Sequence, residues 1–230
     1  MGSVRMLRTD EALLTCGVVL APVFYIVVLI QMATRTGFDI TRHAISSLSL
    51  GDAGWIQITN FVTTGTLAIL FAIGVRWALR GGKAGTAAPL LIGLYGLGMI
   101  MAGVFPPDAA LGFPPGTPDE MPATMSTSAT LHSIAFFTAF TSLVITCYVF
   151  RRRFTSQGEQ RWAKSSIAVG IAAPVLIALG TAALPRIAGV FFFIVGLVAF
   201  GWLSAVAARL LAERKASQTS PAEAPRRSLI

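Results

Sequence analysis

The chain has 230 residues, of which 54% are hydrophobic and only 12% are charged, and its formal net charge is +8 at pH 7. A soluble domain usually has about a quarter charged residues, so this composition excludes an ordinary soluble protein. It indicates an integral membrane protein built from segments long enough to cross a bilayer.

Six continuous apolar segments follow one another along the chain, and each could cross a hydrocarbon core of about 30 Å as a helix. The predicted helices cover residues 12–33, 55–79, 87–105, 128–150, 162–184 and 187–211. The expected fold is therefore all-α, an integral membrane bundle of six transmembrane helices. A short segment, 1–11, precedes it, and a polar, Pro- and Ser-containing segment, 212–230, is predicted to be a disordered tail.

The basic residues predict how the bundle is oriented. If the N-terminus is cytoplasmic, 15 of the 18 Lys and Arg residues fall on the cytoplasmic side, and the other side has only Arg35, Arg42 and Arg186. Because cytoplasmic loops are enriched in Lys and Arg, we predict that both termini are cytoplasmic. This topology explains the positive net charge without nucleic-acid binding, and membrane lipids are the expected partners.

Polar residues within the predicted helices gather in the half of the bundle next to the external loops. Gln57, Asn60 and Thr64 recur at i, i+3 and i+7 and so share one face of the second helix. In the fourth helix, Ser128 and His132 are one turn apart. Such groups are costly in a membrane unless they face the bundle interior and find partners there, so we expect an outward-facing polar pocket.

The external loops add further chemical groups at the same level. The stretch 38–57, "FDITRHAISSLSLGDAGWIQ", joins the first two helices, and the third helix ends in "GVFPPD" at Asp108. The second external loop, 106–127, has six of the twelve prolines, which stiffen the backbone, and we expect it to form an ordered cap. The candidate polar residues of the first loop are Asp39, Arg42, His43, Ser46 and Ser47.

Four stretches in this order resemble a bacterial membrane family, domain of unknown function 998. They are "DITRHAISSLSLGDAGWIQITNF", "GLYGLGMIMAGVFPPD", "GFPPGTP" and "LHSIAFF", and the similarity covers residues 12–208 or so. The resemblance implies a six-helix protein of the bacterial cytoplasmic membrane, and it does not indicate an activity. The positions it marks are Asp39, Arg42, His43, Ser46, Ser47, Gly51, Trp55, Asp108 and His132.

The candidate catalytic residues are His43, His132, Asp39 and Asp108. Two histidines with one carboxylate could hold a divalent metal such as Zn²⁺ and leave a coordination position open. Without a metal, one histidine could act as a general base that Asp39 or Asp108 orients.

The remaining candidates allow both a chemical and a structural interpretation. Ser46 or Ser47 could be the nucleophile of the metal-free site, and Arg42 could bind an anionic head group; Gln57 and Asn60 complete the candidate binding residues. Alternatively, the charged residues of the first loop form a hydrogen-bonded plug that fixes the loop against the fourth helix.

Two classes of function stay open at this point. An enzyme would act on a lipid, isoprenoid or lipid-linked substrate at the outer leaflet. A binding, transport or membrane-assembly protein would use the same groups without catalysis. The inner halves of the predicted helices offer no ionisable residue for a proton path, which favours binding over proton-coupled transport.

Overall fold

The computed structural model describes residues 2–82 and 84–219, and this part of the chain is all-helical, without a β-strand. Six helices are long and apolar enough to cross a membrane. They are α1 (Gly2–Thr34), α2 (Gly54–Ala78), α3 (Ala87–Val104), α4 (Thr127–Ser156), α5 (Gln160–Ala178) and α6 (Ala188–Thr219). The protein is a multi-pass integral membrane protein, and the predicted six-helix fold is confirmed.

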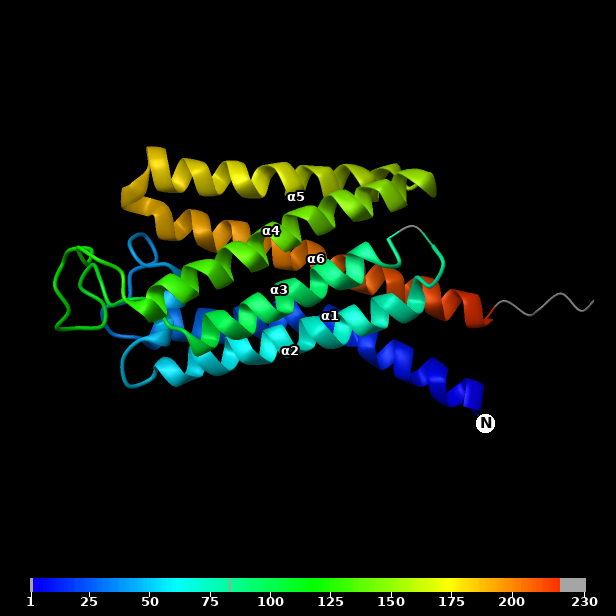
Figure 1. Cartoon of the computed structure of the whole chain (residues 1–230), viewed down its shortest axis with the longest axis horizontal. Helices are drawn as coiled ribbons and strands as arrows, with labels where there is room; N and C mark the ends of the chain where they lie inside the picture. The colour runs from blue at the N-terminus through cyan, green and yellow to red at the C-terminus, as the bar shows by residue number, and fades with distance from the viewer. Residues whose placement is uncertain (1, 83, 220–230) are drawn as a thin grey trace, which may run out of the picture.

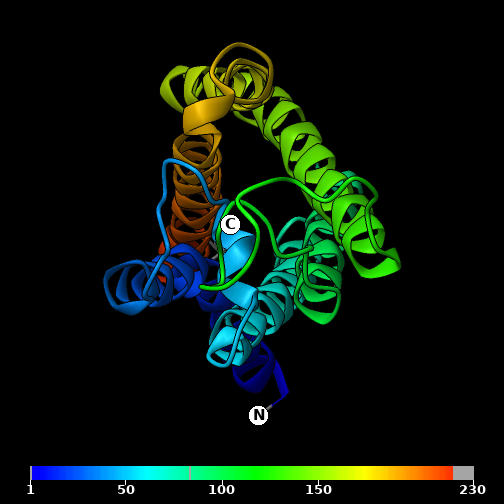
Figure 2. The same ribbon diagram turned by 90° about the vertical axis from the view of Figure 1, so that its left-hand side faces the viewer.

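The helices form a closed ring in which each contacts its neighbours in the sequence and α6 returns to α1. Figure 1 shows that α1 begins and α6 finishes at one end of the bundle, which we call the terminal end. The opposite end, called here the loop end, has the long connections between α1 and α2 and between α3 and α4. Figure 2 views the ring from the loop end, with these connections lying across it.

Three short elements lie at the loop end. A 3₁₀ turn, η1 (Ile45–Ser49), lies within the first connection. A π-helical turn, η2 (Leu179–Ala183), ends α5, and a 3₁₀ turn, η3 (Pro185–Ile187), leads directly into α6. These two turns leave almost no loop between α5 and α6.

Helices α1, α4 and α6 are longer than the sequence predicted, because their terminal-end turns pair with one another outside the apolar spans. Arg214 of α6 bonds to Asp10 of α1 at 2.8 Å, and Arg153 of α4 bonds to Glu213 at 2.9 Å. These ion pairs stabilise helix in the polar segments, so α6 continues past the predicted boundary at 211. Residues 220–230 of the predicted tail lie outside the described residues.

Close approach of backbones holds α2, α3 and α4 together. A Cβ atom on Gly96 would lie 2.6 Å from the carbonyl oxygen of Gly65 on α2, and one on Gly98 would lie 2.7 Å from the carbonyl oxygen of Ala135 on α4. Only glycine fits at these two positions. Small residues let membrane helices pack closely in this way.

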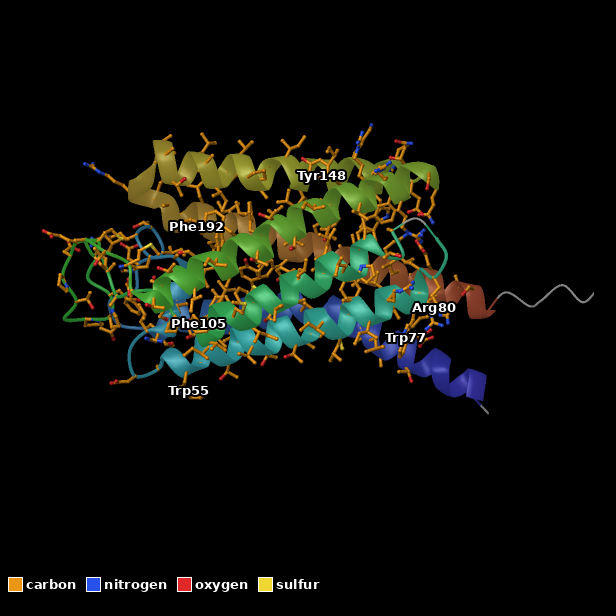
Figure 3. The ribbon with its side chains drawn as sticks, viewed as in Figure 1. Trp55, Trp77, Arg80, Phe105, Tyr148 and Phe192 are labelled. Carbon is orange, nitrogen blue, oxygen red and sulfur yellow. The ribbon has the colours of Figure 1, made fainter. Side chains whose placement is uncertain are left out.

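Aromatic residues near the two ends of the bundle mark the levels expected of the membrane–water interfaces. Trp55 lies at the loop-end start of α2 and is 64% exposed, whereas Trp77 and Tyr148 lie toward the terminal end (Figure 3). Trp and Tyr are enriched at both interfaces of membrane proteins. Their positions are consistent with helices that cross the bilayer roughly along the long axis of the molecule.

Candidate functional site

A cavity of about 330 Å³ lies inside the helix ring and receives residues from all six helices. Residues Ala44, Ile45 and Ser46, at the start of η1, form part of its wall. Its lining is mainly apolar, with nine aromatic side chains: Phe24, Tyr25, Phe61, Tyr95, Phe136, Phe137, Phe140, Phe192 and Phe200. The sequence predicted a polar pocket, and this expectation is corrected, because none of Asp39, Arg42, His43 and Asp108 lines the cavity.

One side of the cavity reaches the membrane-facing surface of the bundle. Phe137 of α4 lines the cavity and is also 62% exposed. Helix α4 leans away from α5 toward the loop end (Figures 1 and 2), and Ile177 near the end of α5 lines the cavity on this side. The rings of Phe136 on α4 and Phe192 on α6 meet edge to face, with centroids 5.8 Å apart. The exposed side of the cavity therefore lies between α4 and the α5–α6 pair, and its rim is aromatic.

His132 of α4 is one of the polar residues that line the cavity. Its Nδ1 lies 2.8 Å from the carbonyl oxygen of Phe105 and 3.1 Å from that of Ala102. Carbonyl oxygens only accept, so this network assigns the hydrogen of a neutral ring to Nδ1 and leaves a lone pair on Nε2. Among the described residues Nε2 has no hydrogen-bond partner, which leaves it available to a molecule in the cavity.

A second unpartnered polar group in the wall belongs to Tyr95 of α3. Its side chain is 1% exposed, yet its hydroxyl has no hydrogen-bond partner in the part of the chain that the structure describes. Tyr25 also lines the cavity, and its hydroxyl donates a long bond, 3.4 Å, to the carbonyl oxygen of Phe193. Neither tyrosine was among the predicted site residues, although Tyr95 stands out in the sequence as a polar ring among the glycines of the third helix.

His43 joins the two loops and lies outside the cavity wall. Its Nδ1 accepts from the backbone N–H of Asp39 at 2.9 Å, and its Nε2–H donates to the carbonyl oxygen of Leu111 at 3.0 Å. The ring also lies between Phe38 and Phe113, with centroids 5.5 and 5.3 Å away. Both nitrogens are thus occupied by the backbone, and His43 serves as a clamp between the loops.

The arginines of the first loop also contact the cap rather than the cavity. Arg42 forms an exposed ion pair with Asp119. Arg35 donates to the carbonyl oxygens of Leu48 and Leu50 and lies over the ring of Phe113, 5.4 Å from its centroid. Arg42 does not line the cavity. The charged residues do form a hydrogen-bonded plug, but its partners lie in the second loop, at Leu111 and Asp119, and not on α4 as the sequence suggested.

The two candidate carboxylates each organise their own loop. Asp39 accepts from the hydroxyl and the backbone N–H of Thr41 at 2.7 and 2.8 Å, and these bonds lower the pKa of its carboxyl. Asp108 accepts from the backbone N–H of Ser126 at 2.9 Å, and hydrogen bonds from Ser126 lower its pKa as well. The structure shows no hydrogen bond between either carboxylate and a histidine ring nitrogen.

Gln57 and Asn60 lie in a buried polar seam between α1 and α2. Gln57 Oε1 accepts from Gln31 at 2.8 Å and from Asn60 at 3.3 Å, and Asn60 also donates to the carbonyl oxygen of Phe24. Both residues are buried, as their shared helix face predicted, but neither lines the cavity. Gln31, which is also buried, was not among the predicted site residues.

The structure therefore brings together only part of the predicted site. Ser46 and His132, from segments far apart in the sequence, line the same cavity, while Ser47 forms part of the η1 turn. Among the described residues, no three His, Cys, Asp or Glu side chains are placed to hold a metal ion. The hypothetical His₂–carboxylate centre is not assembled, because both nitrogens of His43 are bonded to backbone atoms.

The family model described as "Protein of unknown function (DUF998)" matches residues 18–209. The chain belongs to this family. The DUF998 match covers the cap, the cavity wall and the core of all six helices. No curated protein and no solved structure matches the chain of this DUF998 protein.

Proposed function

We propose that this DUF998 protein binds a membrane lipid and holds an apolar part of it in the cavity. The observation that carries the proposal is the aromatic cavity that continues to the membrane-facing surface at Phe137. Pockets of this kind, apolar with a few polar groups, are typical of ligand sites. A lipid could enter sideways from the bilayer, with the remainder of its chains staying outside.

The proposal places the protein in the bacterial plasma membrane, with the terminal end in the cytoplasm. The charge asymmetry of the sequence supports this orientation. The cavity then lies in the outer half of the bilayer, beneath the cap formed by the two loops. Lipids of the outer leaflet are accordingly the proposed partners.

Binding is favoured over passage across the membrane by the way the terminal end is closed. Arg209 bonds to Glu159, which precedes α5, at 2.7 Å, and Glu213 and Asp10 pair with Arg153 and Arg214. These contacts join α1, α4, α5 and α6 at that end. The cavity is lined by residues of the loop-end half, so it offers a holding site rather than a continuous path.

Filling the cavity tests the proposal. Ser133 lines the cavity and its hydroxyl bonds only to Ala129 of its own helix, at 3.0 Å. We expect Ser133→Phe to reduce co-purifying lipid at least fivefold, measured by mass spectrometry of the full-length protein. Ile134→Phe is the matched control, since Ile134 is 51% exposed on the same helix and should retain lipid normally. Absence of bound lipid in the natural protein, or equal retention in both variants, would overturn the proposal.

Lipid hydrolysis or transfer is the second candidate function, and the free Nε2 of His132 specifically favours it. The ring is held through Nδ1 by backbone carbonyls and presents a lone pair on a cavity that Ser46 also lines, an arrangement suited to a general base. If the protein is an enzyme, His132→Gln should lower lipid turnover by about 10²-fold or more while folding is kept. Unchanged membrane lipid composition in both a deletion strain and this variant would exclude it.

A further inference from the structure

The chemistry of the cavity wall indicates which lipids the proposed site accepts. We infer that it selects an uncharged lipid whose head group has a hydroxyl, and that this hydroxyl donates a hydrogen bond to Nε2 of His132. The inference rests on the proposed function and adds the substrate class to it. It has three supports: the absence of charge in the wall, the proton arrangement of His132, and the unpartnered hydroxyl of Tyr95.

The first support is the neutrality of the wall. Among the described residues that line the cavity, none is Lys, Arg, Asp or Glu. The arginines of the nearby first loop are engaged elsewhere, Arg35 with backbone carbonyls and Phe113, and Arg42 with Asp119. A phosphate in the cavity would be buried without a counter-charge, which is strongly unfavourable. This excludes an anionic head group inside the cavity.

The second support is the hydrogen-bonding direction at His132. With Nδ1–H committed to the carbonyl oxygens of Ala102 and Phe105, the neutral ring can only accept at Nε2. A charged ring would have no carboxylate in the wall to pair with, so the neutral form fits the site. The ligand group facing Nε2 must therefore be a donor, and a hydroxyl is the donor that uncharged membrane lipids commonly supply.

The third support is the second polar position at Tyr95. Seven residues separate Tyr95 from Ala102 on α3, two turns or about 10 Å along the helix axis, so its hydroxyl lies deeper than His132. A buried hydroxyl without a partner is unfavourable, and an ester carbonyl of the lipid would accept from it. An acylglycerol has both groups, a terminal hydroxyl and ester carbonyls further along the molecule.

The test compares three lipids with identical acyl chains: 1,2-dioleoylglycerol, its 3-O-methyl ether and dioleoylphosphatidic acid. Each is offered to the full-length protein in phosphatidylcholine nanodiscs, and retention is measured by mass spectrometry. We expect dioleoylglycerol to be retained about tenfold better than the ether, which has lost the donor, and the phosphatidic acid to be retained least. Equal retention of the ether and the alcohol, or preference for the phosphatidic acid, would overturn the inference.

A variant links the preference to His132. In His132→Phe the ring volume is kept but the acceptor is lost, so dioleoylglycerol retention should fall to the level of the ether, and ether retention should not change. A preference that survives in this variant would contradict the role of Nε2. If His132→Phe does not fold, the lipid comparison on the natural protein still decides the inference.

The same data distinguish a failure of the hydroxyl selectivity from a failure of lipid binding itself. If all three lipids are retained equally and Ser133→Phe abolishes their retention, the cavity binds lipid but the hydroxyl selectivity is wrong. If none is retained and no other lipid co-purifies, the proposed function fails together with the inference.

Discussion

The two histidines of this protein have opposite surroundings at the scale of single residues. His43 is 4% exposed and uses both ring nitrogens to join the two loops. His132 is fixed through one nitrogen and keeps the other for the cavity. Residue type alone suggested the same role for both, whereas their hydrogen bonds assign one to the cap and the other to the proposed lipid site.

Removing the hydrogen bonds of His43 should destabilise the cap. His43→Phe keeps a ring against Phe38 and Phe113 but leaves the N–H of Asp39 and the carbonyl oxygen of Leu111 without their partner. We expect the free energy of unfolding to fall by about 1–3 kcal/mol, measured by denaturant unfolding in detergent.

The control for His43→Phe is Arg42→Gln, which removes the neighbouring ion pair with Asp119. The side chains of this pair are 40% and 74% exposed, so its loss should change stability by less than about 1 kcal/mol. Equal losses in the two variants would show that His43 contributes no more than a surface contact.

The carboxyl of Asp108 gives a prediction on pH. Hydrogen bonds from the hydroxyl and backbone N–H of Ser126 lower its pKa in the folded state. The stability that these bonds provide is therefore complete above the ordinary aspartate pKa of about 3.9 and is lost as pH falls through the lowered folded value. Asp108→Asn should melt at a lower temperature than the natural protein near pH 7, and the difference should shrink below pH 4. A difference independent of pH would contradict this linkage.

At the scale of helices, the contacts of α3 with α2 and with α4 are set by glycines on two different faces of α3. Gly96 and Gly98 bring the backbones of α2 and α4 close. Since Tyr95 and Met99 on the same helix line the cavity, this packing also fixes one wall of the proposed site. Helix α5 packs less tightly, with only 28% of its most apolar window buried, and its Ile177 lines the exposed side of the cavity.

Substitutions within α3 should distinguish a glycine that contacts a neighbouring helix from a glycine that does not. In Gly96→Ala the new Cβ would meet the carbonyl oxygen of Gly65 at 2.6 Å, so α2 and α3 must move apart. We expect a loss of about 1–3 kcal/mol in the free energy of unfolding, as for other overpacked sites.

Gly93→Ala is the control on the same helix, because no atom outside its immediate chain neighbours lies within 4 Å of a Cβ built there. It should leave stability unchanged or raise it slightly, since alanine favours helix over glycine. Similar destabilisation by both changes would show that helix propensity, rather than contact with α2, governs this face.

At the scale of the whole molecule, the two ends of the bundle are held by different interactions. Ion pairs between α1, α4, α6 and the start of α5 join the terminal end. At the loop end, the two loops clamp each other through His43 and Phe113. The first loop also contacts the start of α6, where a Cβ on Gly189 would meet the carbonyl oxygen of His43. Between these two ends, the cavity has an exposed lining residue, Phe137, on the side between α4 and the α5–α6 pair.

The helices could be predicted from the sequence because their signals are local. A span such as α3 needs only about 18 consecutive apolar residues, and in a membrane a helix satisfies its own backbone. The burial of Gln57 and Asn60 followed from helical spacing in the same way. The predicted ends of α4 and α6 were less accurate, because the last turns of these helices depend on ion pairs such as Arg153–Glu213, which joins residues 60 positions apart.

The candidate site required the tertiary structure. The sequence pointed to His132 and Ser46, which do line the cavity, but it did not distinguish them from His43, Asp39 and Asp108. Polar residues at the same depth in the membrane can face either the cavity or the loops, and residue type alone does not say which. The contact of His43 with Leu111 spans 68 residues and that of His132 with Ala102 spans 30. Local composition thus determined the helices and their number, whereas the divergence of α4 from α5 and the long-range hydrogen bonds decided which polar groups face the cavity.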